Sequence, residues 1–92
     1  MKDNKIIWTM RTRMSYSHVD IGEARKEVEK WRGMTDLQFT LMQNELHAAN
    51  LHAPHSREDE LDRAERRLAE LVKWEKDANA ILNLWDRYGD DA

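Results

Sequence analysis

The sequence contains no cysteine, only one proline and three glycines, and no long run of apolar residues. Without cysteine, the chain can form no disulfide, no cysteine zinc site and no thiol nucleophile. The apolar run near the start, Ile6-Ile7-Trp8, is far too short for the hydrophobic segment of a signal peptide or for a membrane span. We therefore expect a soluble, cytoplasmic protein without a membrane partner.

Charged residues make up 36% of the 92-residue chain and hydrophobic residues 40%, which is typical of a small globular protein. A chain of this length buries only about two-thirds of the surface that it exposes when unfolded, so we expect a single domain with a thin core. The net charge is -3, but residues 1–16 sum to +3 and residues 57–92 to −4. An acidic body disfavours non-specific binding of nucleic acid, which leaves the basic N-terminal arm as the place for such a contact.

Residues 1–16 are expected to form an extended basic arm, because apolar and polar side chains alternate along 5–16 in the manner of a strand. Ile6, Trp8 and Met10 would share one side of this strand. No second strand pattern follows in the sequence, so its edge would need to pair with another chain. The spacing of Ile6, Met10 and Met14 also fits one face of an amphipathic helix, which is the alternative for this segment.

Three helices are predicted after the arm, over residues 20–32, 36–50 and 57–88, so the fold is expected to be mainly α. The first has an apolar stripe at three- and four-residue spacing, formed by Ile21, Ala24, Val28 and Trp31. The third would be nearly 50 Å long at about 1.5 Å per residue, too long for the two shorter helices to cover. Its far end has a broad apolar set consisting of Ile81, Leu82, Leu84, Trp85 and Tyr88. That end is expected to need a second neighbour.

The helix over 36–50 has the clearest start signal in the sequence. Thr35 and Gln38 have the spacing of a capping box, and Met34 and Phe39 flank it as a hydrophobic staple. Apolar side chains then occupy two faces of the helix. A helix that is apolar on two sides is expected to lie between two neighbours, so this helix is predicted to be the central element.

Three histidines, His47, His52 and His55, cluster around the end of that helix and the following loop. Imidazole is the commonest metal ligand in proteins, so the cluster is a candidate metal site. Its spacing matches no familiar ligand motif and no acidic ligand accompanies it, which favours ordinary polar surface residues instead. No cofactor is expected.

The chain lacks the patterns that catalysis needs. Its serines have no nucleophile-elbow context, and no glycine-rich loop could hold a phosphate. The carboxylates Glu58, Asp59 and Glu60 lie at the predicted start of a helix, where negative charge complements the helix dipole. We therefore predict that the protein is not an enzyme.

The order strand, helix, glycine-containing turn, helix over residues 5–51 is similar to that of the ribbon–helix–helix DNA-binding family. In that family two chains pair their strands, and the polar strand face reads bases in the major groove. The resemblance implies that Thr9, Arg11 and Arg13 would contact DNA. It rests on element order over about half of the chain, while the acidic body and the long third helix depart from the family pattern. A small dimeric transcriptional regulator is thus one alternative function.

The leading hypothesis is a non-catalytic protein-binding module that associates with itself, as a homodimer, or with a partner protein. Inhibitors, antitoxins and the accessory regulators of phages and plasmids fit this description. Because tryptophan and tyrosine dominate interface hot spots, we expect the interface residues to be Trp8, Met10, Tyr16, Ile81, Trp85 and Tyr88. A third hypothesis is a helical protein that sequesters a small ligand such as a nucleotide in a pocket between helices and subunits, with Tyr16, Trp31 and nearby Lys or Arg side chains as pocket walls.

Overall fold

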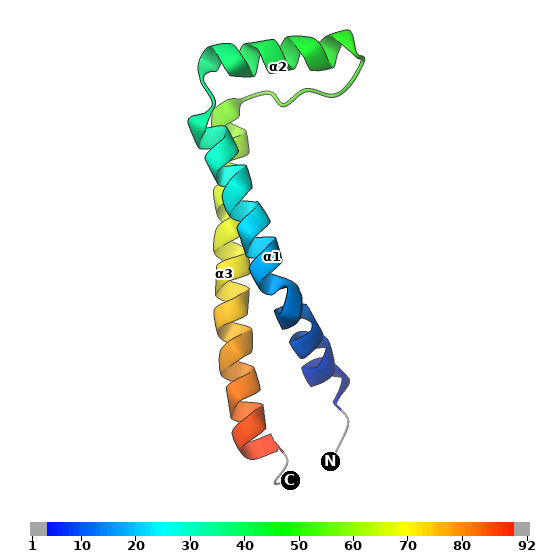
Figure 1. Ribbon diagram of the computed structural model, residues 1–92, viewed down its shortest axis with the longest axis vertical. Coiled ribbons are helices and arrows are strands. Elements are labelled where there is room, and N and C mark those ends of the chain that lie inside the picture. Colours follow the sequence, from blue (N-terminus) through cyan, green and yellow to red (C-terminus); the bar gives the residue numbers. More distant parts are fainter. Residues whose placement is uncertain (1–3, 90–92) are drawn as a thin grey trace. The chain divides into compact units, whose positions relative to one another are not determined.

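The computed structural model describes residues 4–89, and within that range it contains three helices and no strand (Figure 1). Helix α1 spans Lys5–Gly33, α2 spans Asp36–Ala48 and α3 spans Arg57–Tyr88. The prediction of a mainly helical chain is confirmed. Helix α3 has the bounds that the sequence predicts, and α2 ends two residues before the predicted end.

The predicted strand over 5–16 is wrong, because these residues form the first part of α1. Asn4 starts the helix: its Oδ1 accepts hydrogen bonds from the N–H groups of Ile6 at 2.9 Å and Ile7 at 3.2 Å. In a helix every backbone group in the segment finds a partner inside the chain, whereas a single strand would leave a row of them unpaired. The predicted helix over 20–32 is the second part of the same element.

The chain divides into two compact units, which are described separately below. The first unit consists of Met1–Glu23 and Ala69–Ala92, and the second unit consists of Ala24–Leu68. Helices α1 and α3 each contribute one segment to the first unit and one segment to the second unit. Helix α2 belongs to the second unit.

The second unit has a core in which all three helix segments take part. Its buried members are Val28, Trp31, Phe39 and Ala64, with Met34, Met42, Leu61 and Leu68 packed against them. The rings of Trp31 and Phe39 meet edge to face with their centroids 6.3 Å apart. The indole N–H of Trp31 donates to Glu27 Oε1 at 2.8 Å, so this buried polar group is satisfied.

Helix α2 starts as the sequence predicts. The Thr35 hydroxyl accepts from the N–H of Gln38 at 3.1 Å, and the Gln38 side chain accepts from the N–H of Thr35 at 2.9 Å. This capping box places Phe39 in the core and Met34 against it, which also confirms the hydrophobic staple.

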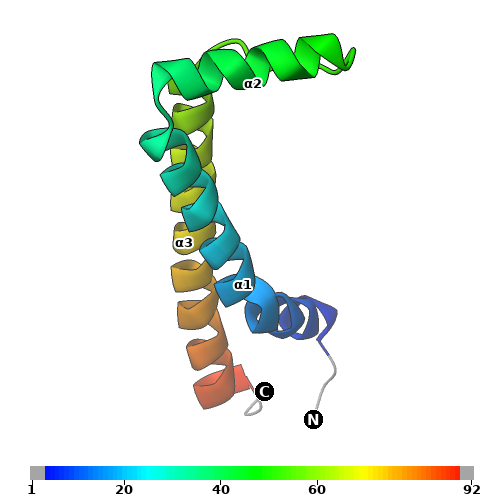
Figure 2. The same cartoon turned by 45° about the horizontal axis from the view of Figure 1, so that its top comes forward.

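Helix α2 is not a central element, because only one of its two apolar faces is covered. Phe39 is buried, whereas Leu37 and Leu41 on the other side are 69% and 53% exposed. Residues 49–56 run back along α2 (Figure 2), and the Gln43 side-chain amide donates to the carbonyl of Pro54 at 2.9 Å. Helix α3 then begins with Ser56 Oγ accepting from the N–H of Asp59.

Replacing Trp31 with alanine is expected to lower the free energy of unfolding by about 3–5 kcal/mol, because it leaves a cavity where Phe39 and Val28 now pack. Urea denaturation followed by circular dichroism at one fixed protein concentration measures the change. Leu37→Ala in the same unit is the control, since its exposed side chain is expected to change stability by less than about 0.5 kcal/mol. Equal losses for both variants would contradict the assigned core.

Replacing Thr35 with alanine is expected to cost about 1 kcal/mol, because one half of the capping box is lost and the N–H of Gln38 loses its acceptor. Thr40→Ala is the matched control. The Thr40 hydroxyl donates to the carbonyl of Asp36 within the helix, where alanine has the better helix propensity. The same denaturation series should therefore show no loss of stability for Thr40→Ala.

Candidate functional site

The first unit is a pair of antiparallel helix segments, α1 up to Glu23 and α3 from Ala69 onwards (Figure 1). Their contact buries one stripe on each helix. The buried apolar residues of this unit are Ile7, Ile21, Ala78 and Leu82. Ser17, which is 7% exposed, lies on the same stripe of α1 and is the buried polar residue.

Three polar contacts join the two segments of this unit. The buried Ser17 hydroxyl donates across the pair, with its Oγ 2.6 Å from Glu75 Oε2. Arg11 of α1 forms an ion pair with Asp86 of α3. The guanidinium of Arg13 lies over the Trp74 ring, 4.1 Å from its centroid, which is a cation–π contact. These contacts fix the register of the two helices.

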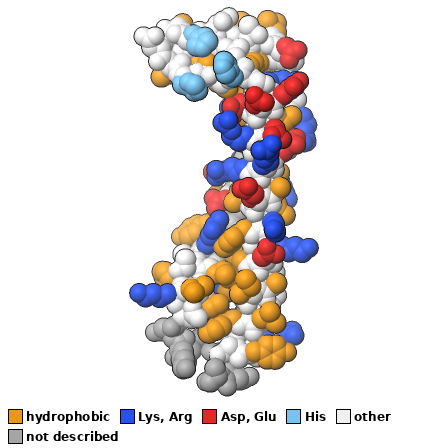
Figure 3. Space-filling view, turned by 180° about the vertical axis from the view of Figure 1, so that it is seen from behind, with side chains coloured by type: hydrophobic (Ala, Val, Ile, Leu, Met, Phe, Trp, Pro, Cys, Tyr) orange, Lys and Arg blue, Asp and Glu red, His pale blue; other side chains and the backbone are white. Residues whose placement is uncertain are grey.

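Large apolar side chains remain exposed on both helices of the first unit. On α1 the exposed fraction is 72% for Ile6, 69% for Trp8 and 61% for Tyr16. On α3 it is 57% for Leu84 and 61% for Tyr88, and Ile81 is also exposed. Figure 3 shows hydrophobic side chains gathered over this unit, next to the grey residues at the chain ends.

The outward side of α1 is uncharged over about three turns, from Trp8 to Val19. Trp8, Thr12, Tyr16 and Val19 follow each other at steps of three or four residues and are all exposed. We call this set the outer α1 stripe. Successive residues of a helix are rotated by about 100°, which places the outer α1 stripe on roughly the opposite side of the helix from its buried stripe. Charged side chains normally cover an outward helix face, so a face without them indicates a contact surface.

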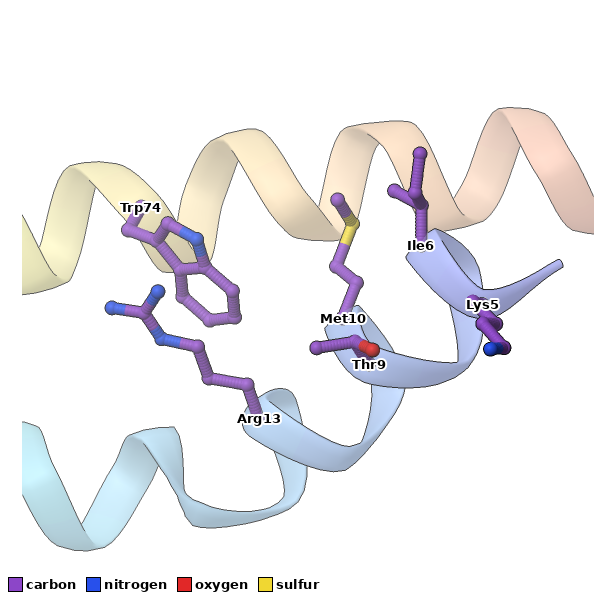
Figure 4. Close-up of a pocket in the computed structure, with 6 residues that line it drawn as sticks. All are labelled: Lys5, Ile6, Thr9, Met10, Arg13 and Trp74. Carbon is purple, nitrogen blue, oxygen red and sulfur yellow. The ribbon is translucent and has the colours of Figure 1, made fainter.

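Two cavities open between the helices of the first unit. The smaller, of about 340 Å³, is lined by Lys5, Ile6, Thr9, Met10, Arg13 and Trp74 (Figure 4). The larger, of about 450 Å³, is lined by Ile7, Ile81, Leu84, Trp85, Tyr88 and Gly89. None of the described residues that line the larger cavity is charged, so this lining suits an apolar side chain rather than a polar ligand.

Gly89 shapes one wall of the larger cavity. A Cβ atom at this position would lie 2.5 Å from the Trp85 ring, which is closer than carbon atoms can approach. The absence of a side chain therefore lets the indole of Trp85 lie against the backbone of the next turn.

The structure places all six predicted interface residues in the first unit. Trp8, Tyr16, Ile81 and Tyr88 are exposed, and Met10 and Trp85 are half-buried as cavity walls. The prediction omitted Ile6, Leu84 and Trp74. Ile6 was recoverable from the helical spacing with Met10, whereas the contact of Trp74 with Arg13 joins positions that are distant in the sequence and had no local signal.

The residues of the DNA-binding alternative do not form one face. Residues two apart share a side of a strand, but on a helix they point about 200° apart. Arg11 accordingly pairs with Asp86, while Thr9 and Arg13 line the smaller cavity. The paired-strand arrangement that this alternative requires is absent from residues 4–89.

The histidine metal site and the small-ligand pocket with Tyr16 and Trp31 as walls are not formed as the sequence suggested. His47, His52 and His55 are exposed, and among the residues that the structure describes no group of three His, Cys, Asp or Glu side chains could hold a metal ion. Trp31 is buried in the core of the second unit, so it cannot be the wall of a ligand pocket. Tyr16 belongs to the first unit and lines neither of its two cavities.

Among the described residues, no helix combines the length and the apolar character needed to cross a membrane. The comparisons with known proteins do not assign the chain to a family. No family model, no curated protein and no solved structure matches it.

Proposed function

We propose that this protein is a non-catalytic binding module that acts by associating with a second copy of itself through the first unit. The observation behind the proposal is the exposed apolar surface of that unit. It consists of the outer α1 stripe and the α3 residues Ile81, Leu84 and Tyr88. We call this set the apolar surface of the first unit.

The exposed aromatic area of this surface alone is about half of what one partner buries in a typical specific interface. An aromatic side chain has about 150–250 Å² to bury, so Trp8, Tyr16 and Tyr88 together expose roughly 400 Å² at their observed fractions. The exposed aliphatic side chains raise this total further. A typical specific interface buries about 800 Å² on each partner, and the largest apolar patch on a monomer is about 300–600 Å².

The charge of the first unit favours a second copy as the occupant. Its described residues include six basic and six acidic side chains, so two copies meet without net repulsion. A second copy also brings the same two helices, which would complete a four-helix arrangement around the exposed aromatic residues. Such a contact uses one patch on both subunits, as two-fold symmetric dimers do.

Light scattering coupled to size-exclusion chromatography tests the proposal across the micromolar range. The wild-type chain is expected at twice its 11.0 kDa mass. Leu84→Glu and Trp8→Glu each place a charge in the interface without a partner, which is expected to weaken dimerisation by about tenfold or more. Both variants should therefore shift towards the mass of one chain on dilution.

Leu37→Glu is the matched control, because Leu37 is as exposed as Trp8 but lies on α2 in the second unit. Its mass should equal that of the wild type. A wild-type chain that keeps the mass of one copy at every concentration would overturn the proposal. A dimer that neither first-unit variant weakens would overturn the assigned surface.

A further inference from the structure

The smaller cavity of the first unit combines two kinds of lining. Ile6, Met10 and Trp74 form an apolar part (Figure 4). Lys5, Thr9 and Arg13 follow each other at four-residue steps along α1 and form a polar row beside it. The row contains two cationic groups and one hydroxyl, and among residues 4–89 no acidic side chain lines the cavity.

The two cations of this row are not neutralised within the described part of the chain. The ion pairs formed there involve Arg11, Arg32, Arg57, Arg63 and Arg66, but neither Lys5 nor Arg13. The guanidinium of Arg13 lies over the Trp74 ring, and a guanidinium carries five N–H donors, none of which forms a hydrogen bond to the described residues. With Lys5, Thr9 and Arg13 beside Ile6, Met10 and Trp74, the cavity offers positive charge and hydrogen-bond donors next to apolar side chains.

We propose that this cavity binds a small amphipathic anion, namely an apolar chain or ring that ends in a carboxylate. The volume of about 340 Å³ lies within the usual range of small-molecule sites. The apolar body of the ligand contacts Ile6, Met10 and Trp74, and the carboxylate accepts hydrogen bonds from Arg13 and Thr9. Lys5 adds a second positive charge along the same row.

Ligands of other chemistry use only part of this lining. A neutral alcohol of the same length gains the apolar contacts but no charge-assisted hydrogen bond, which is about twice as strong as a neutral one. An alkylammonium ion meets like charge at Lys5 and Arg13. A short anion such as acetate gains the charge but leaves the apolar part uncovered. An amphipathic anion is the ligand that uses both the cationic row and the apolar part of the lining.

The proposal is independent of self-association. All six lining residues belong to one chain, and the site is complete without a second copy. The described lining of the larger cavity consists of apolar residues, tyrosine and glycine, so within residues 4–89 it offers no cation to a carboxylate and is not part of this site.

Fluorescence titration of the tryptophans with octanoate, octan-1-ol, octylammonium and acetate tests the proposal in the wild-type chain. Octanoate is expected to bind saturably, with one molecule per chain and about tenfold more tightly than octan-1-ol. Octylammonium and acetate are expected to bind more weakly than octanoate. Equal affinities for octanoate and octan-1-ol, or an octanoate signal that does not saturate, would overturn the proposal.

Variants then locate the site. The double variant Lys5→Met with Arg13→Met is expected to reduce the affinity for octanoate to that for octan-1-ol, whereas Ile6→Ala is expected to weaken both. Lys26→Met removes an exposed cation from the second unit and should change neither affinity. An equal loss with Lys26→Met would indicate an effect of overall charge and would contradict the site. Circular dichroism shows whether the double variant folds. If it does not, the proposal is tested by the affinities of the wild-type chain for octanoate, octan-1-ol and octylammonium alone.

Light scattering on the same samples keeps the two proposals apart. A chain that remains monomeric but prefers octanoate to octan-1-ol would contradict the self-association and support the cavity. A dimer that binds octanoate and octan-1-ol equally tightly would support the self-association and contradict the cavity.

Discussion

Two antiparallel helices can bury only the stripe along which they touch, and the first unit consists of one such pair. The second unit shows what a third helix adds. There α2 places Phe39 against Trp31, and an aromatic residue of α1 becomes a buried core residue. The described part of the first unit has no third helix. Trp8, Tyr16 and Tyr88 consequently remain in contact with solvent even though they are as apolar as the residues of the core.

The polar contacts of the first unit complement this thin core. Hydrophobic packing along one stripe resists separation of the helices but determines their register only weakly. Ser17 with Glu75, Arg11 with Asp86 and Arg13 with Trp74 each join defined positions of the two helices. Ser17 is the buried member of this set, and its hydroxyl lies within hydrogen-bond distance of Glu75 on the other helix as well as of the Met14 carbonyl in its own helix. The contacts thus favour one register, and with it the arrangement of side chains on the exposed side.

The sequence was sufficient to predict those elements whose signals are local. The capping box at Thr35 and Gln38 involves neighbouring residues, and the structure has it. The error over 5–16 has an equally local cause. Ile6, Met10 and Met14 satisfy both the two-residue period of a strand and the four-residue step of a helix. Asn4, a good helix cap immediately before the segment, was the signal that distinguishes the two.

The sequence could predict which residues belong to the apolar surface of the candidate site, but it could not predict how the residues of its smaller cavity are arranged. Exposed aromatic residues on α1 and a broad apolar end of α3 follow from the sequence whether residues 5–16 are a strand or a helix. The smaller cavity was not predictable, because it requires Lys5, Thr9 and Arg13 on one helix face and Trp74 opposite them. A strand would place Arg11 beside Arg13 on one face, whereas the helix turns Arg11 towards Asp86. The same three basic residues therefore form an evenly charged strip in one conformation and one ion pair plus a two-cation cavity in the other.

The chemistry of the first unit separates its two proposed contacts. The outer α1 stripe is uncharged, so water is displaced from it by another apolar surface at no electrostatic cost. The smaller cavity has two cations at its rim, and covering them with an apolar surface would leave charge without water or a partner. A second copy is therefore favoured on the outer stripe and along Leu84 and Tyr88, while an anion is favoured between Lys5 and Arg13. One pair of helices can in this way present a surface for a protein and a site for a small molecule, because Lys5, Arg11 and Arg13 lie beside the outer α1 stripe and not on it.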